Sequence, residues 1–139
     1  MPRYSRLSQE RLDTCHTAVR QVFNEVIKVF DCSILCGHRG EEEQNLVFSN
    51  GDSRCEWPNS SHNDMPSLAV DAAPYYFERP HIRWDRDSLY RWYYFGGVVV
   101  TTAYYLGITI RWGGDWDRDT YVRDQKFNDL PHFELVVSP

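Results

Sequence analysis

Two histidines and two aspartates in distant segments have the types and spacing of a hydrolytic metal site. His62 and Asp71 lie in one segment, and Asp129 and His132 lie near the C-terminal end. Imidazole and carboxylate groups are usual ligands of catalytic zinc, which keeps an open position for water and lowers the pKa of that water to about 7. Three of these residues would hold one Zn²⁺ ion, and the remaining carboxylate would take a proton from water. The predicted chemistry is hydrolysis.

The composition limits the classes of protein to consider. The chain has 139 residues, of which 42% are hydrophobic, and this suits a single compact domain over residues 1–139. Its 15 basic and 20 acidic residues give a net charge of −5, and no basic stripe stands out. We therefore expect a monomer that does not bind nucleic acid.

Two sequence features bear on location. Residues 1–5 lead directly into a polar amphipathic stretch, without the apolar core or cleavage site of a secretory signal, so we expect synthesis to end in the cytoplasm. Residues 92–110 carry no charge and are long enough to consider as a membrane span. Their Thr, Tyr and Gly content, and the β-branched residues after Gly107, favour a buried helix followed by a strand instead.

The four cysteines, Cys15, Cys32, Cys36 and Cys55, form no Cys-x-x-Cys pair. We expect free, mostly buried thiols, because an unpaired cysteine behaves as a small hydrophobic residue. A structural zinc site built from Cys32, Cys36 and Cys55 is a less favoured alternative, since no fourth ligand follows at a recognisable spacing.

The first half of the chain predicts two helices and two strands. Apolar residues at helical spacing predict a helix over residues 8–30, and a short apolar run predicts a buried strand over residues 32–36. Acidic residues in the first turn favour a helix over residues 41–48. An ordered loop over residues 52–67 would carry His62, and a strand over residues 68–73 would carry Asp71.

The second half predicts one long helix and further strands. Asp85 is a suitable N-cap for a helix that runs toward Leu106, although its two central glycines each cost about 1 kcal/mol. The strands are predicted over residues 82–84, 108–112 and 132–137, with a polar connection over residues 113–130.

Several motifs resemble those of the zinc-dependent peptidoglycan peptidases, a family that includes phage L-alanyl-D-glutamate endolysins and bacterial D,D-carboxypeptidases. The resemblance extends over residues 32–136 and is carried by Ser60-x-His62, Ala69-Val70-Asp71, Asp129-x-x-His132-Phe133-Glu134-Leu135, Gly37-His38-Arg39 and Gly113-Gly114-Asp115-Trp116. It implies a small α+β domain of the hedgehog/DD-peptidase type, in which helices flank an antiparallel sheet at the site.

The resemblance also implies roles for the four residues. His62, Asp71 and His132 would hold one Zn²⁺ ion, and Asp129 would be the general base. The chain departs from the family's frequent Ser-x-His-x-x-Gly-x-Ala-x-Asp pattern, because eight residues separate His62 from Asp71.

Four other residues are candidates for binding substrate. Arg39 could stabilise the oxyanion or bind a substrate carboxylate, or it could form solvated ion pairs with the nearby glutamates. Ser60 could hydrogen-bond the substrate or only satisfy the backbone of its loop. Asp115 and Trp116 could line a peptide pocket, or form a turn with one packed aromatic ring.

The sequence therefore predicts a zinc peptidase that cuts a stem-peptide bond of bacterial peptidoglycan, with the L-Ala–D-Glu bond favoured by the resemblance. Such an enzyme would act on the cell wall or in the periplasm after release, or from a virion. One alternative is a D-Ala-D-Ala carboxypeptidase. An alternative of another class is a non-catalytic cell-wall-binding or virion structural domain.

Overall fold

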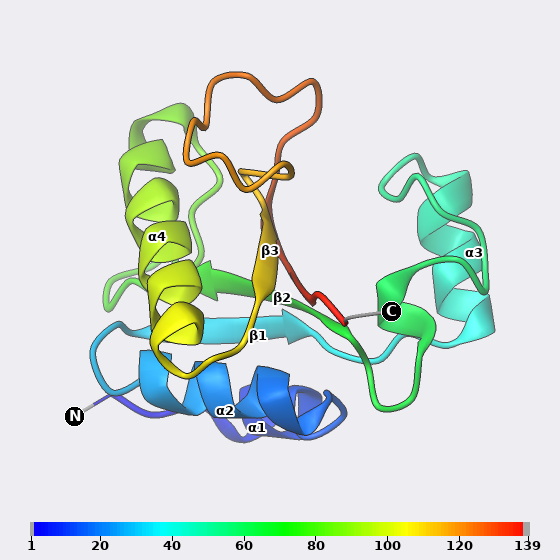
Figure 1. Cartoon of the computed structure of the whole chain (residues 1–139), viewed down its shortest axis with the longest axis horizontal. Helices are drawn as coiled ribbons and strands as arrows, with labels where there is room; N and C mark the ends of the chain where they lie inside the picture. The colour runs from blue at the N-terminus through cyan, green and yellow to red at the C-terminus, as the bar shows by residue number, and fades with distance from the viewer. Residues whose placement is uncertain (1, 138–139) are drawn as a thin grey trace.

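The computed structural model describes residues 2–137, and this range contains a four-stranded antiparallel sheet and four α-helices (Figure 1). The strands are β1 (Cys32–Cys36), β2 (Ala69–Pro74), β3 (Ile110–Gly113) and β4 (Asp129–Leu135), in the order β1-β2-β4-β3. The helices are α1 (Arg6–Leu12), α2 (Thr17–Val26), α3 (Glu41–Ser49) and α4 (Leu89–Tyr105), with short 3₁₀ turns η1 (Ser61–Asn63) and η2 (Arg86–Ser88). The predicted α+β fold with an antiparallel sheet is confirmed.

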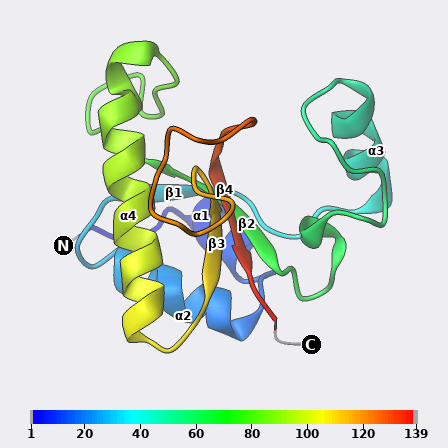
Figure 2. The ribbon, with the colours of Figure 1, turned by 45° about the horizontal axis from the view of Figure 1, so that its top comes forward.

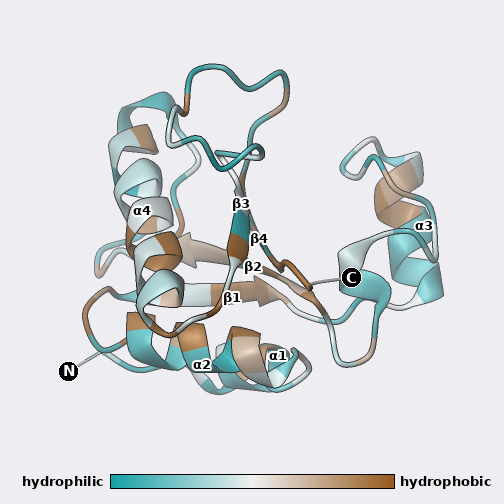
Figure 3. Cartoon of the chain, in the orientation of Figure 1, coloured by the Kyte–Doolittle hydropathy of each residue, from teal (hydrophilic) through white to brown (hydrophobic). Residues whose placement is uncertain are grey.

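The hydrophobic core lies between one face of the sheet and the helices α2 and α4. The ring of Phe133 on β4 meets Phe23 of α2 and Phe95 of α4 edge-on, with centroids 5.6 and 5.7 Å away. All three rings are fully buried. In Figure 3, hydrophobic residues lie along the side of α2 that is nearest to β1. The core therefore fixes which face of each strand points inward.

The opposite face of the sheet carries the predicted ligands. Successive side chains of a strand alternate between faces, and Val70 pairs with Phe133 in the core while Asp71 pairs with His132. Asp71 and His132 therefore point away from the core, side by side. An irregularity in β1 after Ile34 lets Cys36 pair with Asp71, which places Cys36 on this same face.

The predicted single helix over residues 8–30 is wrong, because the chain breaks into α1 and α2. Residues 14–16 leave the helix to bond segments from elsewhere in the chain. Ser67 donates its N–H to the carbonyl of Thr14 at 2.9 Å and accepts from His16 N at 2.8 Å, and His38 N donates to Thr14 Oγ1 at 2.8 Å. The side chain of His16 then caps α2.

The predicted strand over residues 82–84 is also wrong. This segment packs on the start of α4 and does not join the sheet: the rings of Trp84 and Trp92 lie 4.9 Å apart, and Trp92 Nε1 donates to the carbonyl of Arg83 at 2.8 Å. The predicted strand over residues 132–137 begins earlier, at Asp129, and ends at Leu135. The other predicted helices and strands form within a few residues of their expected bounds.

The helix α3 lies apart from the other three helices, beyond the ends of β1 and β2 (Figures 1 and 2). The longest helix of residues 2–137 is α4, with 17 residues, and none in this range has the length and hydropathy of a bilayer span.

The two central glycines of α4 have different environments. A Cβ atom on Gly96 would lie 2.3 Å from the ring of Trp112, which is buried, stacks on Phe133 and donates Nε1 to the carbonyl of Leu130 at 2.7 Å. A Cβ atom on Gly97 would meet nothing within 4 Å. Of the two glycines, it is therefore Gly96 that allows the close approach of α4 to Trp112.

Replacing each glycine by alanine tests this packing. Gly97→Ala should raise the free energy of unfolding by about 1 kcal/mol through helix propensity. Gly96→Ala should lower it by about 1–3 kcal/mol, because the held Trp112 ring must move. Urea unfolding of both variants measures the difference, and equal stabilisation would show that the Trp112 ring is free to shift.

Candidate metal centre

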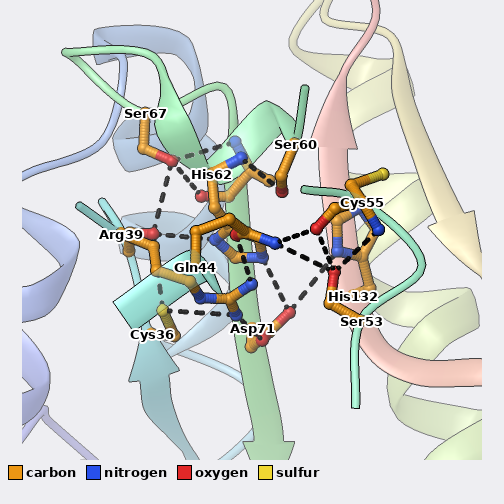
Figure 4. Close-up of polar contacts among 12 residues, drawn as sticks. Cys36, Arg39, Gln44, Ser53, Cys55, Ser60, His62, Ser67, Asp71 and His132 are labelled. Carbon is orange, nitrogen blue, oxygen red and sulfur yellow. Dashed lines mark hydrogen bonds and ion pairs between the residues drawn. The ribbon is translucent and has the colours of Figure 1, made fainter. Parts of the chain in front are cut away.

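Three side chains from two strands and a loop converge on one point. His62 Nε2 lies 3.2 Å from Asp71 Oδ1, and His132 Nδ1 lies 3.5 Å from the same oxygen (Figure 4). The two imidazole centroids are 5.2 Å apart, and one ligand atom from each of the three residues lies within 4.8 Å of the others. The structure thus brings together the three predicted ligands in an arrangement able to hold a metal ion.

Each imidazole has its outer nitrogen bound to an oxygen that can only accept a hydrogen bond. His62 Nδ1 lies 2.7 Å from the carbonyl oxygen of Gly37, and His132 Nε2 lies 2.7 Å from Glu134 Oε1. Both outer nitrogens must therefore carry hydrogen, so only the inner nitrogens could give a lone pair to a metal ion, after losing their own protons. Outer partners of this kind are usual for histidines that ligate metals. The donor set fits a divalent ion.

The turn η1 positions His62. Ser60 Oγ accepts from His62 N at 3.2 Å, and Asn63 Oδ1 accepts from Ser60 N at 3.0 Å, which forms a reciprocal capping box. Although eight residues separate His62 from Asp71, more than in the family's frequent pattern, the loop still places His62 next to Asp71. The hydroxyl of Ser60 serves this turn, and its predicted contact with substrate stays a prediction.

An irregularity in β4 places Asp129 beside the same site. Gly113 on β3 pairs with Asp129, whereas the preceding Trp112 pairs with Phe133, so residues 130–132 are extra in β4. Pro131 suits such a position because it has no N–H to give to the ladder. A Cβ atom on Gly113 would lie 2.0 Å from the carbonyl oxygen of Asp129, so only glycine allows this approach.

The electrostatics of the site follow from its burial and mixed charges. Burial lowers the pKa of His62, but the hydrogen bond that His62 donates to the Asp71 carboxylate helps to outweigh burial, and the pKa is raised to about 10. The pKa of His132 is also raised, since Asp71 and Glu134 outweigh its burial. The pKa of Asp71 falls, because the two histidines outweigh its own desolvation. Burial and the negative charge of Asp71 raise the pKa of Asp129.

The other predicted site residues differ in how close they lie. Arg39 Nη2 lies 3.5 Å from Asp71 Oδ2, so Arg39 belongs to the cluster. The ring of Trp116 lies 5.4 Å from that of His132, and its Nε1 donates to the carbonyl of Phe127 at 2.8 Å. The carboxylate of Asp115 instead accepts from the backbone of Asp119 and Thr120, within its own turn.

The cysteines do not form a metal site. Cys15 and Cys32 are buried and Cys36 and Cys55 partly so, and all four are free thiols. Within residues 2–137, two groups of three side chains are close enough to hold a metal ion, and neither group contains a cysteine. One group is His62, Asp71 and His132, and the other is Asp115, Asp117 and Asp119. The alternative of a structural zinc site on Cys32, Cys36 and Cys55 is therefore wrong.

Glu134 is a site residue to which the sequence analysis gave no role. Its Oε2 accepts from Arg111 Nη2 at 2.7 Å while its Oε1 holds His132. The signal was present, because His132 and Glu134 are two residues apart in a strand and so share a face. A carboxylate at this spacing from a predicted ligand is a natural outer partner.

Comparison with known proteins identifies the family. The family model described as phage L-alanyl-D-glutamate peptidase matches residues 1–136. The chain belongs to this family. Membership makes it a peptidoglycan peptidase, a hydrolase of the L-alanyl-D-glutamate type, and confirms the predicted family and activity.

The fold is similar to that of a solved structure. The crystal structure of Serratia marcescens L-Ala D-Glu endopeptidase ChiX matches with a TM-score of 0.71 and 22% sequence identity, over 97% of this chain and 91% of that one. No match was found among curated protein sequences.

The contact between His132 and Glu134 can be tested by metal binding. Glu134→Gln keeps the size of the side chain but weakens the hold on the imidazole, so zinc affinity should fall about 10- to 100-fold. Competition with a chromophoric chelator measures this affinity. Glu10→Gln, at an exposed glutamate paired with Arg6, is the control and should leave affinity unchanged. Equal affinities for both variants would contradict the role of Glu134.

The raised pKa values of both histidines predict how metal binding depends on pH. A histidine with a raised pKa stabilises the metal-free fold fully below about pH 6.5, and this stability is lost as pH rises through the folded pKa. A metal ion must displace these protons, so binding should release protons and affinity should rise from pH 6 to pH 8. Calorimetry in buffers of different ionisation enthalpy measures the release. Binding without proton release would mean that both imidazoles are already neutral.

Proposed function

We propose that this peptidase cleaves the L-Ala–D-Glu bond of the peptidoglycan stem peptide with one Zn²⁺ ion held by His62, Asp71 and His132. Asp129 is the general base, and Arg39 is an electrostatic partner of the substrate. The observation that carries the proposal is the convergence of the inner nitrogens of two imidazoles on the carboxylate of Asp71.

The donor set supports zinc over harder cations. Two imidazole nitrogens and one carboxylate are typical of catalytic zinc sites, whereas calcium and magnesium prefer oxygen ligands throughout. Bound zinc would supply Lewis acidity toward a water molecule and toward the carbonyl oxygen of the scissile amide. The second oxygen of Asp71 stays next to Arg39 at 3.5 Å, which keeps the carboxylate oriented.

Asp129 has the properties that a general base needs. It lies three residues before His132 on β4 and is half-buried, and within residues 2–137 its carboxylate has no hydrogen-bonding or ion-pair partner. Its raised pKa brings its basicity closer to neutral pH, which favours proton transfer in both directions. Asp129 would take a proton from the attacking water and give it to the leaving amine.

Arg39 would stabilise negative charge on the substrate. Its guanidinium is largely buried beside Asp71, and a desolvated arginine stabilises charge more strongly than one in bulk water. It would stabilise the developing oxyanion or bind a carboxylate of the stem peptide. Trp116, whose ring lies 5.4 Å from that of His132 at an angle of 39°, would form one wall of the peptide site. The reaction would take place on the cell wall.

The assignment of Asp129 is tested by removing its charge. Asp129→Asn should lower turnover of purified sacculi by about 100- to 10,000-fold, because the general base is lost. Zinc content should stay at that of the wild type, since Asp129 is not a ligand. Asp124→Asn, on the exposed part of the same connection, is the matched control and should retain activity.

Mass spectrometry of the digested muropeptides identifies the bond. New L-Ala and D-Glu termini are the expected products, and release of free D-Ala with an intact L-Ala–D-Glu bond would support the carboxypeptidase instead. A biological effect that survives in Asp129→Asn would support the non-catalytic alternative.

A further inference from the structure

Gln44 is a polar residue in a position where helices usually bury an apolar one. It is 0% exposed and is the buried residue of α3, whereas Leu46 on the same helix is 59% exposed. An amphipathic helix normally turns apolar side chains inward, and burying an amide costs free energy unless all its polar groups are bonded. The burial of Gln44 therefore implies a specific set of partners.

All of the hydrogen-bonding capacity of Gln44 is used (Figure 4). Its Oε1 accepts from Arg39 Nη1 at 3.0 Å and from Asn63 Nδ2 at 3.1 Å. Its Nε2 donates to Ser53 Oγ at 3.0 Å and to the carbonyl of Cys55 at 2.6 Å. Arginine can only donate and a carbonyl can only accept, so these partners fix the orientation of the amide.

Arg39 is thereby held from two sides. A guanidinium is planar, so fixing Nη1 on Gln44 also fixes the direction of Nη2, which points to Asp71 Oδ2 and to Cys36 Sγ. The backbone of Arg39 is bound as well, because its N–H donates to the carbonyl of His62 at 2.8 Å and its carbonyl accepts from Asn63 Nδ2 at 3.1 Å.

We propose that Gln44 is a positioning residue, which holds the Arg39 guanidinium against Asp71 and joins it to the turn that carries His62. The inference rests on the proposed function, in which Arg39 acts on the substrate. Gln44 itself hydrogen-bonds neither Asp71 nor the two imidazoles. Without Gln44, Arg39 keeps its charge but its guanidinium loses its fixed direction. The catalytic rate then falls because Arg39 is misplaced.

A double-mutant cycle separates positioning from general stabilisation. Gln44→Met keeps the length of the side chain but removes all four hydrogen bonds, and should lower kcat/KM about 10- to 100-fold, because misplacing a catalytic group by about 1 Å has effects of this size. The loss should fall on the same parameter, kcat or KM, that Arg39→Ala changes. In the Arg39→Ala background, Gln44→Met should change kcat/KM by less than about twofold.

Leu46→Met, at the exposed position on the same helix, is the control and should leave kcat/KM unchanged. Losses from Gln44→Met and Arg39→Ala that multiply in the double variant would overturn the proposal, since Gln44 would then act independently of Arg39.

NMR of the chelator-treated protein gives a readout that does not need activity. Arg39 Nε is buried without a hydrogen-bond partner, so its N–H is shielded from solvent and should give a resolved signal in the wild type. Gln44→Met should broaden or shift this signal as the guanidinium becomes mobile. An unchanged Arg39 signal in folded Gln44→Met would overturn the positioning role, whether or not the protein cleaves peptidoglycan.

Gln44→Glu covers the case in which Gln44→Met does not fold. Glutamate can still accept from Arg39 and Asn63 but cannot donate to Ser53 or Cys55. It should keep the Arg39 signal resolved and retain more activity than Gln44→Met. Loss of the Arg39 signal in folded Gln44→Glu would overturn the proposal. If the wild-type protein had no peptidase activity but its Arg39 signal still depended on Gln44, the proposed function would be rejected and the positioning role of Gln44 would stand.

Discussion

The carboxylate of Asp71 is the interaction on which the site depends. Two imidazoles and a guanidinium, all groups that can carry positive charge, lie within 3.5 Å of its two oxygens in a largely buried place. Without this negative charge, burial and mutual repulsion would drive these groups apart. Its own position is fixed by the pairing of β2 with strands on both sides, since β2 lies inside the sheet. The sheet therefore provides a rigid base for the charges.

The side chains of the site are oriented by contacts within the protein itself. The carbonyl of Gly37 and the carboxylate of Glu134 hold the two imidazoles from outside, and the capping box of Ser60 and Asn63 holds the turn that carries His62. A ligand set that is already oriented loses little conformational entropy on binding. The partners come from the residue after β1, from β4 and from η1 with its N-cap, so segments far apart in the sequence orient the site together.

The sequence was sufficient for the fold class and for the three predicted ligands that meet at the site, but it gave no role to Glu134 or Gln44. Alternation along β2 and β4 separates core residues from ligands, so Asp71 and His132 could be placed from local patterns. The break between α1 and α2 could not, because apolar residues such as Leu12, Cys15 and Val19 continue at helical spacing through it. It arises from hydrogen bonds to Ser67 and His38, which are distant in the sequence. Gln44 was missed for a related reason: it follows three exposed glutamates, and its burial depends on partners in other loops.

The interruption at residues 14–16 ties α1 to the active centre. Thr14 accepts hydrogen bonds from the backbone N–H groups of Ser67 and His38. Ser67 lies just before the strand that carries Asp71, and His38 follows Gly37, whose carbonyl orients His62. A Cβ atom on Gly37 would lie 2.3 Å from the carbonyl of Arg11, so α1 packs directly beneath this segment. A fragment that began at β1 would contain every predicted ligand. It would lack α1 and Thr14, which pack against and hydrogen-bond the loops that position those ligands.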